Sequence, residues 1–256
     1  GAASGHIGGS LSSLDILITL YFHVMRVNPD APQAPERDRF VLSKGHCTPA
    51  LYSTLAQRGF FPLEELKQFR RIEGHMSGHA EMRHVKGVDM STGSLGQGIS
   101  AAVGMALAGK ADGRDYRVYA LLGDGEIEEG QVWEAAMAAA KYRLDNLCAV
   151  VDVNGLQIDG ATADVMPSEP LDQKFEAFNW NVIRVDGHDY AALAEAFAAA
   201  AACKGKPTVL LARTVKGKGV SFMEGDYGWH GKAPNAEQYE KARAELAARV
   251  AELEGK

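Results

Sequence analysis

The fold-determining stretch runs from residue 116 to residue 154 and reads YRVYALLGDGEIEEGQVWEAAMAAAKYRLDNLCAVVDVN. The apolar run 116–122 predicts a buried strand, the alanine-rich run 129–143 predicts a helix, and Leu147–Val153 predicts a second buried strand. A strand, a helix and a strand in this order form a βαβ unit with parallel strands. The stretch therefore predicts an α/β fold, a three-layer α/β/α arrangement around a mostly parallel central sheet.

Two short polar segments follow the two strands of this unit. Gly123-Asp124-Gly125 comes after the first strand and Asn154-Gly155-Leu156 after the second. Because parallel strands joined by one crossover end at the same edge of the sheet, both segments are expected at the edge where ligands of α/β sheets bind. The Asp124 carboxylate, the Asn154 amide oxygen and a loop carbonyl such as that of Leu156 would supply three oxygen ligands to Mg²⁺.

The glycines beside Asp124 let the backbone turn sharply and approach a phosphate, and the following helix start offers free N–H groups to an anion. A Gly-Asp-Gly tripeptide alone is more typical of an ordinary strand-to-helix turn. Glu128 stands where the third glycine of a nicotinamide dinucleotide fingerprint would be, so that fingerprint is a poor match. The two polar segments together predict a divalent metal held on a diphosphate.

The composition sets broad limits on the class of protein. A chain of 256 residues is long enough for one large α/β domain, and we expect residues 1–256 to form a single diphosphate-binding domain. Three cysteines lack metal-ligand spacing and are expected to be reduced, as in the cytoplasm. The absence of a signal sequence or long apolar run disfavours a membrane, and the net charge of −6 disfavours nucleic acid as a partner.

The remaining elements follow from hydrophobic periodicity and from breakers. Ser12 and Asp15 have the spacing of a capping box at the first predicted helix. Residues 74–96 are rich in Gly, His and Ser without a clear period, which is typical of a binding loop. Further helices are predicted at residues 11–25, Thr48–Arg58, 63–69, 96–110, 190–203 and 236–253, and further strands at Arg39–Leu42, 181–185 and Thr208–Arg213.

The spacing of Gly-Asp-Gly and Asn resembles the signature of the thiamine diphosphate-binding domain of transketolase. The resemblance covers nearly the whole chain and is carried by further segments: SGHIGGSLS (4–12), LSKGHCTPALY (42–52), SGHAEM (77–82), STGSLGQGIS (91–100) and KGKGVSFMEGDYGWHGKAP (216–234). It implies the thiamine diphosphate-binding fold, with thiamine diphosphate and Mg²⁺, or Ca²⁺ or Mn²⁺ in its place, as cofactors.

The resemblance also implies roles for single residues. His6 and His230 match the pair that handles donor-sugar hydroxyls and proton transfer, His46 a residue near the cofactor diphosphate and thiazolium, and His79 a residue that contacts the substrate C1 hydroxyl and carbonyl. Gly93, Ser94 and Leu95 match a Gly-Pro-Leu segment that meets the aminopyrimidine ring, with serine in place of proline. Glu129 matches an acidic residue at a subunit interface. His75 matches no family position firmly, and we expect His23, His84 and His188 to be structural.

A complete transketolase also has a pyrimidine-binding domain, which carries the glutamate that activates the cofactor, and a further C-terminal domain. The resemblance therefore implies that this chain is the N-terminal subunit of a split transketolase in a hetero-tetramer with a pyrimidine-domain subunit. It implies transfer of a two-carbon ketol unit from a ketose phosphate to an aldose phosphate, as in the pentose phosphate pathway.

Two other interpretations stay open. The chain could be a subunit of another thiamine enzyme, similar to 1-deoxyxylulose-5-phosphate synthase or to a 2-oxoacid dehydrogenase, because the metal pair alone does not separate these enzymes. The segments SKGH, SGHAE and GWHGKAP favour the sugar-transferring branch. A non-catalytic cofactor-binding module is the second interpretation, although retention of all four family-matched histidines argues against it.

Overall fold

A parallel sheet of five strands forms the centre of the molecule, of which the computed structural model describes residues 2–255. The strands lie in the order β1-β2-β3-β7-β6, and every neighbouring pair is parallel. Their bounds are β1 Arg39–Leu42, β2 Val118–Gly123, β3 Leu147–Val153, β6 Asn181–Asp186 and β7 Thr208–Arg213. The predicted parallel sheet is therefore confirmed.

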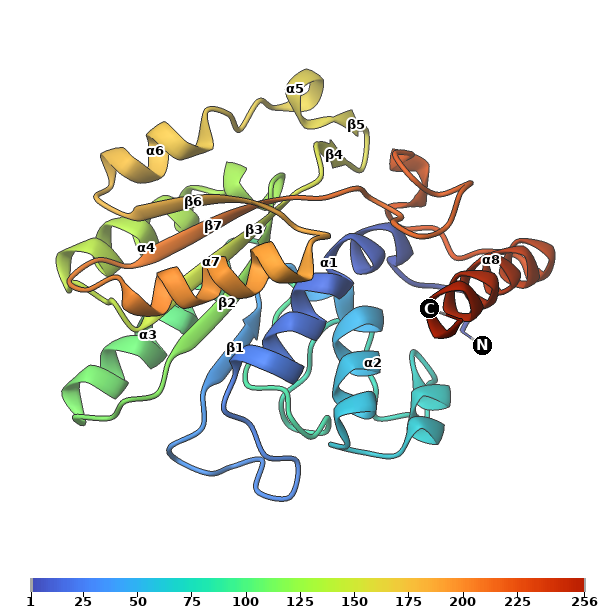
Figure 1. Cartoon of the computed structure of the whole chain (residues 1–256), viewed down its shortest axis with the longest axis horizontal. Helices are drawn as coiled ribbons and strands as arrows, with labels where there is room; N and C mark the ends of the chain where they lie inside the picture. The colour runs from blue at the N-terminus through green and yellow to red at the C-terminus, as the bar shows by residue number, and fades with distance from the viewer. Residues whose placement is uncertain (1, 256) are drawn as a thin grey trace.

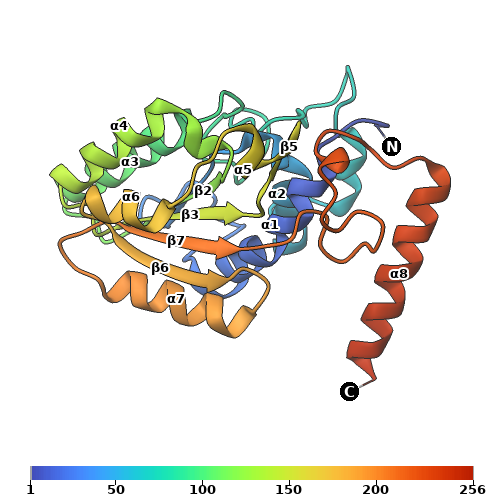
Figure 2. The same ribbon diagram turned by 90° about the horizontal axis from the view of Figure 1, so that it is seen from above.

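Helices cover both faces of this sheet and give the predicted three layers (Figures 1 and 2). One face carries α1 (Ile7–Thr19, continued by a π-helical turn over Leu20–Val24), α2 (Thr48–Arg58) and α7 (Tyr190–Ala202). The opposite face carries α3 (Gln97–Ala111), α4 (Gly130–Lys141) and α6 (Leu171–Ala177). Because α3 and α4 connect β1, β2 and β3 in turn, the carboxyl ends of these strands meet at one edge of the sheet.

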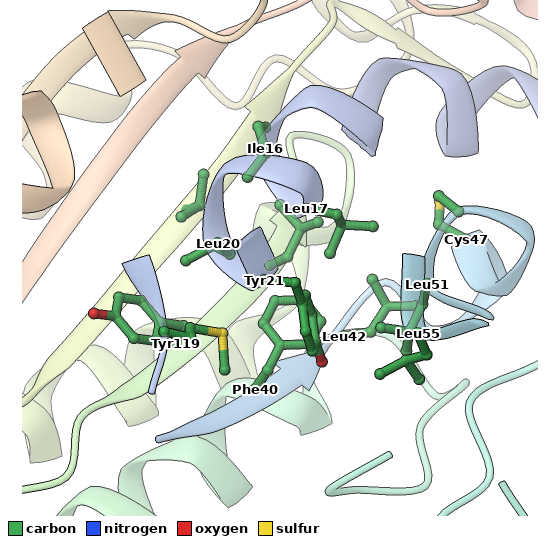
Figure 3. Close-up of a cluster of buried hydrophobic side chains, with 14 of the residues drawn as sticks. Ile16, Leu17, Leu20, Tyr21, Phe40, Leu42, Cys47, Leu51, Leu55 and Tyr119 are labelled. Atoms are coloured by element: carbon green, nitrogen blue, oxygen red, sulfur yellow. The ribbon is translucent and has the colours of Figure 1, made fainter. Parts of the chain in front are cut away.

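Two hydrophobic cores result from the period-2 alternation of the strands. In β2, Tyr119 and Leu121 point into the core beneath α1, α2 and α7, whereas Ala120 and Leu122 point into the core beneath α3, α4 and α6. Figure 3 shows part of the first core, in which Ile16, Leu17 and Leu20 of the first helix lie above Phe40 and Leu42 of β1. Burial on both faces explains why β2 and β3 are almost continuously apolar.

The first helix departs from the prediction at its start. It was expected at residues 11–25 with Ser12 in a capping box, but α1 begins at Ile7 and His6 is its N-cap, without a side-chain cap bond. The reason is that Ser12 is completely buried and its hydroxyl donates to the Asp152 carboxylate, at 2.6 Å between Oγ and Oδ2. Ser12 therefore lies within the helix, where its hydroxyl makes a tertiary hydrogen bond rather than a helix cap.

Other elements were missed or differ in type. The predicted helix 63–69 is a 3₁₀ helix over Leu63–Gln68. Between β3 and β6 the chain forms a small hairpin, β4 (Leu156–Gln157) and β5 (Gly160–Ala161), a one-turn helix α5 (Thr162–Val165) and α6, none of which was predicted. Short strands and single helical turns contain too few residues to produce a period, so sequence patterns do not reveal them.

The two ends of the described chain have contrasting helices. The stretch Ile7–Val24 is long and apolar enough to span a membrane by length and composition, with a mean hydropathy of 1.3, but 56% of it is buried inside the domain, as a core helix is. The predicted charged helix 236–253 is α8 (Ala236–Glu254), which begins with a capping box between Asn235 and Gln238 and projects away from the sheet (Figure 2).

We predict that the sheet centre determines stability. Leu121 is completely buried in β2, so Leu121→Ala should lower the free energy of unfolding by about 2–5 kcal/mol, because it leaves a cavity between sheet and helices. Met137 of α4 is 53% exposed, and Met137→Ala should change the same quantity by less than about 0.5 kcal/mol. Urea unfolding of both variants measures the difference, and equal losses would contradict the assigned core.

Candidate active site

A cavity of about 490 Å³ opens at the carboxyl edge of the sheet. It contains most of the residues that the sequence singled out: His6, His46, His79, Gly93, Leu95, Gly123, Asp124, Gly125, Glu129, Asn154, Leu156 and His230 all line it. Ser94 does not line this cavity and is exposed. The histidine segments, the loop 74–96 and the two strand ends therefore converge on one place, although they are far apart in the sequence.

Asp124 lies at the bottom of this cavity, directly after β2, and is only 3% exposed. Its carboxylate accepts hydrogen bonds from two backbone N–H groups, that of Gly125 at 3.0 Å and that of Gly155 at 2.5 Å. The second bond connects the turn after β2 to the turn after β3. Burial and the nearby Asp152 charge raise the pKa of Asp124 to about 6, so an added cation would stabilise its charged form.

The donor atoms around Asp124 suit a hard cation. Asn154 follows β3 and lines the cavity. Its side-chain oxygen accepts a hydrogen bond from the Leu156 N–H at 3.1 Å, which stabilises the turn after β3. Carboxylate, amide and carbonyl oxygens are the ligands that Mg²⁺ takes. Within residues 2–255 no cluster of three His, Cys, Asp or Glu side chains is placed to hold a metal, so any metal here relies on Asn154 and on backbone oxygen.

Four histidines surround the upper part of the cavity. The ring centroid of His6 lies 5.0 Å from that of His46, 6.1 Å from that of His79 and 5.6 Å from that of His230. Burial lowers the pKa of all four rings, assisted by the positive charges of neighbouring groups. The pKa falls to about 4 for His6 and His46 and to about 3 for His230. The rings are therefore neutral at pH 7, and each offers one donor and one acceptor.

A buried ion pair lies behind the cavity. Lys44 and Asp152 are 2% and 0% exposed, and the Lys44 ammonium donates to the Asp152 carboxylate and to the Gly9 carbonyl at 3.2 Å. Burial opposes the ionisation of Asp152, but the charge of Lys44 and its hydrogen bonds outweigh burial and lower the pKa of Asp152 to about 2. Asp152 accepts further bonds from Ser12, Ser13 and Thr214, so its buried charge is fully satisfied.

Glu126 connects three loops of the site. One of its carboxylate oxygens accepts from the Ser43 hydroxyl at 2.5 Å and from the Gly96 N–H at 3.0 Å, and the other accepts from the Gly123 N–H at 3.0 Å. These donors lie after β1, at the start of α3 and at the end of β2. Burial raises the pKa of Glu126. Its position under the Gly93–Gly96 turn indicates that it shapes the cavity wall.

Sequence reasoning missed several residues of the site, namely Lys44, Glu126, Asp152 and Lys216. Lys44, Glu126 and Lys216 line the cavity, and Asp152 holds Lys44 from behind. Lys44 stands two residues before His46 in the segment SKGH, and Glu126 directly follows Gly123-Asp124-Gly125. The signal for Asp152 was a charged residue inside the apolar strand VVDV, which requires a buried partner.

We predict that His6, His46 and His230 titrate far below the ordinary pKa of 6.5. Because the unfolded chain binds protons near that value and the folded site does not, the site contributes stability above pH 6.5 that is lost as the pH falls toward 4. NMR titration of labelled histidines, assigned with His6→Gln and His46→Gln, should show these two rings neutral at pH 5. Midpoints near 6.5 would contradict the burial of the rings.

The chain is similar throughout its length to transketolases. The family described as "Transketolase, thiamine diphosphate binding domain" matches residues 1–252. The chain is 49% identical to the 6-deoxy-6-sulfo-D-fructose transketolase subunit SqwG of Clostridium sp. (strain MSTE9), over 94% of this chain and 88% of that protein. It is 47% identical to an apulose-4-phosphate transketolase subunit of Phocaeicola vulgatus, over 99% of this chain and 90% of that protein.

Solved structures agree with these relatives. The transketolase of Pichia stipitis in complex with sedoheptulose 7-phosphate matches with a TM-score of 0.92 and 34% identity, over 96% of this chain and 38% of that one. The match includes the parallel sheet whose carboxyl edge carries the cavity. The chain therefore belongs to the transketolase family, in which it corresponds to the thiamine diphosphate-binding domain.

Proposed function

We propose that the chain is the N-terminal subunit of a split transketolase, which transfers a two-carbon ketol unit together with a second polypeptide that carries the pyrimidine-binding domain. The observation that carries this proposal is the cavity itself, which four neutral histidines line together with the oxygen-bearing side chains of Asp124 and Asn154. The relatives that are similar over about nine-tenths of their own length are named as transketolase subunits, which supports the split arrangement. We propose a hetero-tetramer as the assembly and the cytoplasm as its location.

The floor of the cavity would hold the cofactor. The Asp124 carboxylate, the Asn154 side-chain oxygen and the Leu156 carbonyl would bind Mg²⁺, and Ca²⁺ or Mn²⁺ are alternatives with the same ligand preference. Lys216 would face the diphosphate, since it is buried in the cavity wall with its ammonium 3.3 Å from His230 Nδ1. Thiamine diphosphate, when bound, supplies an electron sink for carbon–carbon bond cleavage.

The histidines above the floor would handle the sugar. A neutral imidazole can accept a proton from a hydroxyl and return it, which is the requirement of general acid–base catalysis. His6 and His230 lie with ring centroids 5.6 Å apart and can contact one bound hydroxyl group from two sides. His79 comes from the loop 74–96, lines the same cavity, and would contact the C1 hydroxyl and carbonyl of a donor. His46 lies deeper and would contact the cofactor.

Substrate choice is the part of the function that varies among relatives. One relative is named for 6-deoxy-6-sulfo-D-fructose and another for apulose 4-phosphate, whereas the wider family includes transketolases of full length. Each named sugar carries an anionic group. We propose that the donor of this enzyme is a ketose with a terminal phosphate or sulfonate, and xylulose 5-phosphate of the pentose phosphate pathway is one candidate.

We predict that activity requires both subunits. A coupled assay with thiamine diphosphate, Mg²⁺ and an aldose phosphate acceptor should show turnover only when the chain is mixed with its pyrimidine-domain partner. Xylulose 5-phosphate, apulose 4-phosphate and 6-deoxy-6-sulfo-D-fructose would be compared as donors. Enzyme-like turnover by the chain alone would contradict the shared site, and pyruvate decarboxylation without an acceptor would favour a 2-oxoacid enzyme.

A pair of histidine variants separates an enzyme from a binding module. His79→Ala should lower kcat/KM of the mixture by about 10²- to 10⁴-fold, because it removes the imidazole proposed to contact the C1 hydroxyl and carbonyl of the donor, while the affinity for thiamine diphosphate stays within a few-fold. His84 lies in the same loop, is exposed and binds Glu81, so His84→Ala is the matched control and should leave kcat/KM unchanged. Equal behaviour of the two variants would favour a non-catalytic module.

A further inference from the structure

His188 connects two distant parts of the chain by a hydrogen bond at each ring nitrogen. It lies in the turn between β6 and α7, and its Nδ1 is 2.7 Å from the Asp15 carboxylate of α1. The backbone N–H of Val215 donates to its Nε2 at 2.9 Å. Since a backbone N–H can only donate, Nε2 is unprotonated, so the proton is on Nδ1 and is donated to Asp15. The contacts therefore define a neutral ring with one tautomer.

Val215 belongs to the Lys216 strap, which we define as residues 213–217, namely the last residue of β7 and the four residues after it. The backbone of every strap residue makes a hydrogen bond. Two carbonyls accept: that of Arg213 from the Gly187 N–H at 2.8 Å and that of Lys216 from the Gly225 N–H at 2.9 Å. Three N–H groups donate: that of Thr214 to the Val153 carbonyl at 3.1 Å, that of Gly217 to the Gly8 carbonyl at 3.0 Å, and that of Val215 to His188 Nε2. Of these five bonds, only the one from Val215 ends on a side chain. His188 is thus the backbone anchor of the strap that a substitution can remove.

The strap delivers Lys216 to the cavity. The side chain is 2% exposed, and within residues 2–255 no carboxylate makes a salt bridge with its ammonium. The ammonium instead lies 3.3 Å from His230 Nδ1. A buried ammonium without a salt-bridge partner is costly, so an anion bound in the cavity would stabilise the charged form of Lys216. The strength of the contact between the Lys216 ammonium and such an anion depends on where the strap places the Lys216 backbone. A misplacement of about 1 Å is enough to weaken a charge-assisted contact.

We infer that His188 is a positioning residue of the cofactor site: held by Asp15 in its neutral form, it fixes Val215 and thereby directs Lys216 toward the diphosphate. The inference rests on the proposed function, since it takes the anion to be the diphosphate of thiamine diphosphate. The location of His188 agrees with this role, because α1 and α7 pack side by side on one face of the sheet and the end of β7 lies beside them (Figure 1). His188 itself does not line the cavity.

A double-mutant cycle on the assembled enzyme tests this role. The dissociation constant of thiamine diphosphate with Mg²⁺ would be measured by calorimetry for the unmodified assembly, His188→Ala, Lys216→Met and the double variant. We expect Lys216→Met to weaken binding by about 10- to 100-fold and His188→Ala by about tenfold. In the Lys216→Met background, His188→Ala should change the constant by less than about twofold, because its effect passes through Lys216.

Several variants separate positioning from general stability. His188→Gln retains an acceptor for the Val215 N–H and should restore most of the affinity. His84→Ala, which removes an exposed histidine outside the strap, should change nothing. If His188→Ala does not fold, Asp15→Asn is the alternative variant, because it removes the charged acceptor that holds the proton on His188 Nδ1. It should weaken the binding of thiamine diphosphate only when Lys216 is present.

Equal weakening by His188→Ala in both backgrounds, or none at all with Lys216 present, would overturn the inference. If the unmodified assembly bound no thiamine diphosphate, the proposed function would fail as well. The two failures are therefore distinguishable.

Discussion

The active site depends on the buried carboxylate of Asp152, which holds together segments that are far apart in the sequence. It accepts hydrogen bonds from Ser12 and Ser13 of α1, from Lys44 after β1 and from Thr214 after β7. A single buried charge with four donors fixes the relative positions of α1, which His6 precedes as N-cap, and the two loops that bear His46 and Lys216. Removing one partner of such a pair leaves an uncompensated charge and costs about 3–5 kcal/mol.

The charges around this pair explain why the site suits a cation and a diphosphate together. Burial and then the charge of Asp152 raise the pKa of Asp124, while burial and then the charge of Lys44 lower the pKa of Lys216. A cation would therefore stabilise the charged form of Asp124 and an anion that of Lys216, and a metal diphosphate would supply both. The histidines above are neutral for the same reason, since burial and the lysines disfavour their protonated forms. The cavity therefore combines charged side chains with neutral imidazoles that can exchange protons.

Much of this architecture is readable from the sequence, because βαβ units have strong periods and their polar strand ends meet at one edge. The parallel sheet, its long helices and most of the cavity wall followed from such patterns or from the resemblance of the histidine motifs to transketolase. What escaped prediction depends on tertiary contacts. Ser12 looks like a helix cap until Asp152 is placed beside it, and His188 was expected to be structural, but its contact with Val215 after β7 follows only from the fold. Sequence patterns report contacts between residues that are close along the chain, but not contacts between residues that only the fold brings together.

The central claim is that Asp124, Asn154 and Leu156 hold the metal of a diphosphate cofactor at the carboxyl edge of the sheet. The most direct test is anomalous diffraction from crystals of the assembled enzyme grown with thiamine diphosphate and Mn²⁺. The account predicts one anomalous peak within about 2.0–2.3 Å of the Asp124 carboxylate, the Asn154 side-chain oxygen and the Leu156 carbonyl, with diphosphate oxygens completing the shell. A peak elsewhere in the molecule, or cofactor bound with no metal at Asp124, would contradict it.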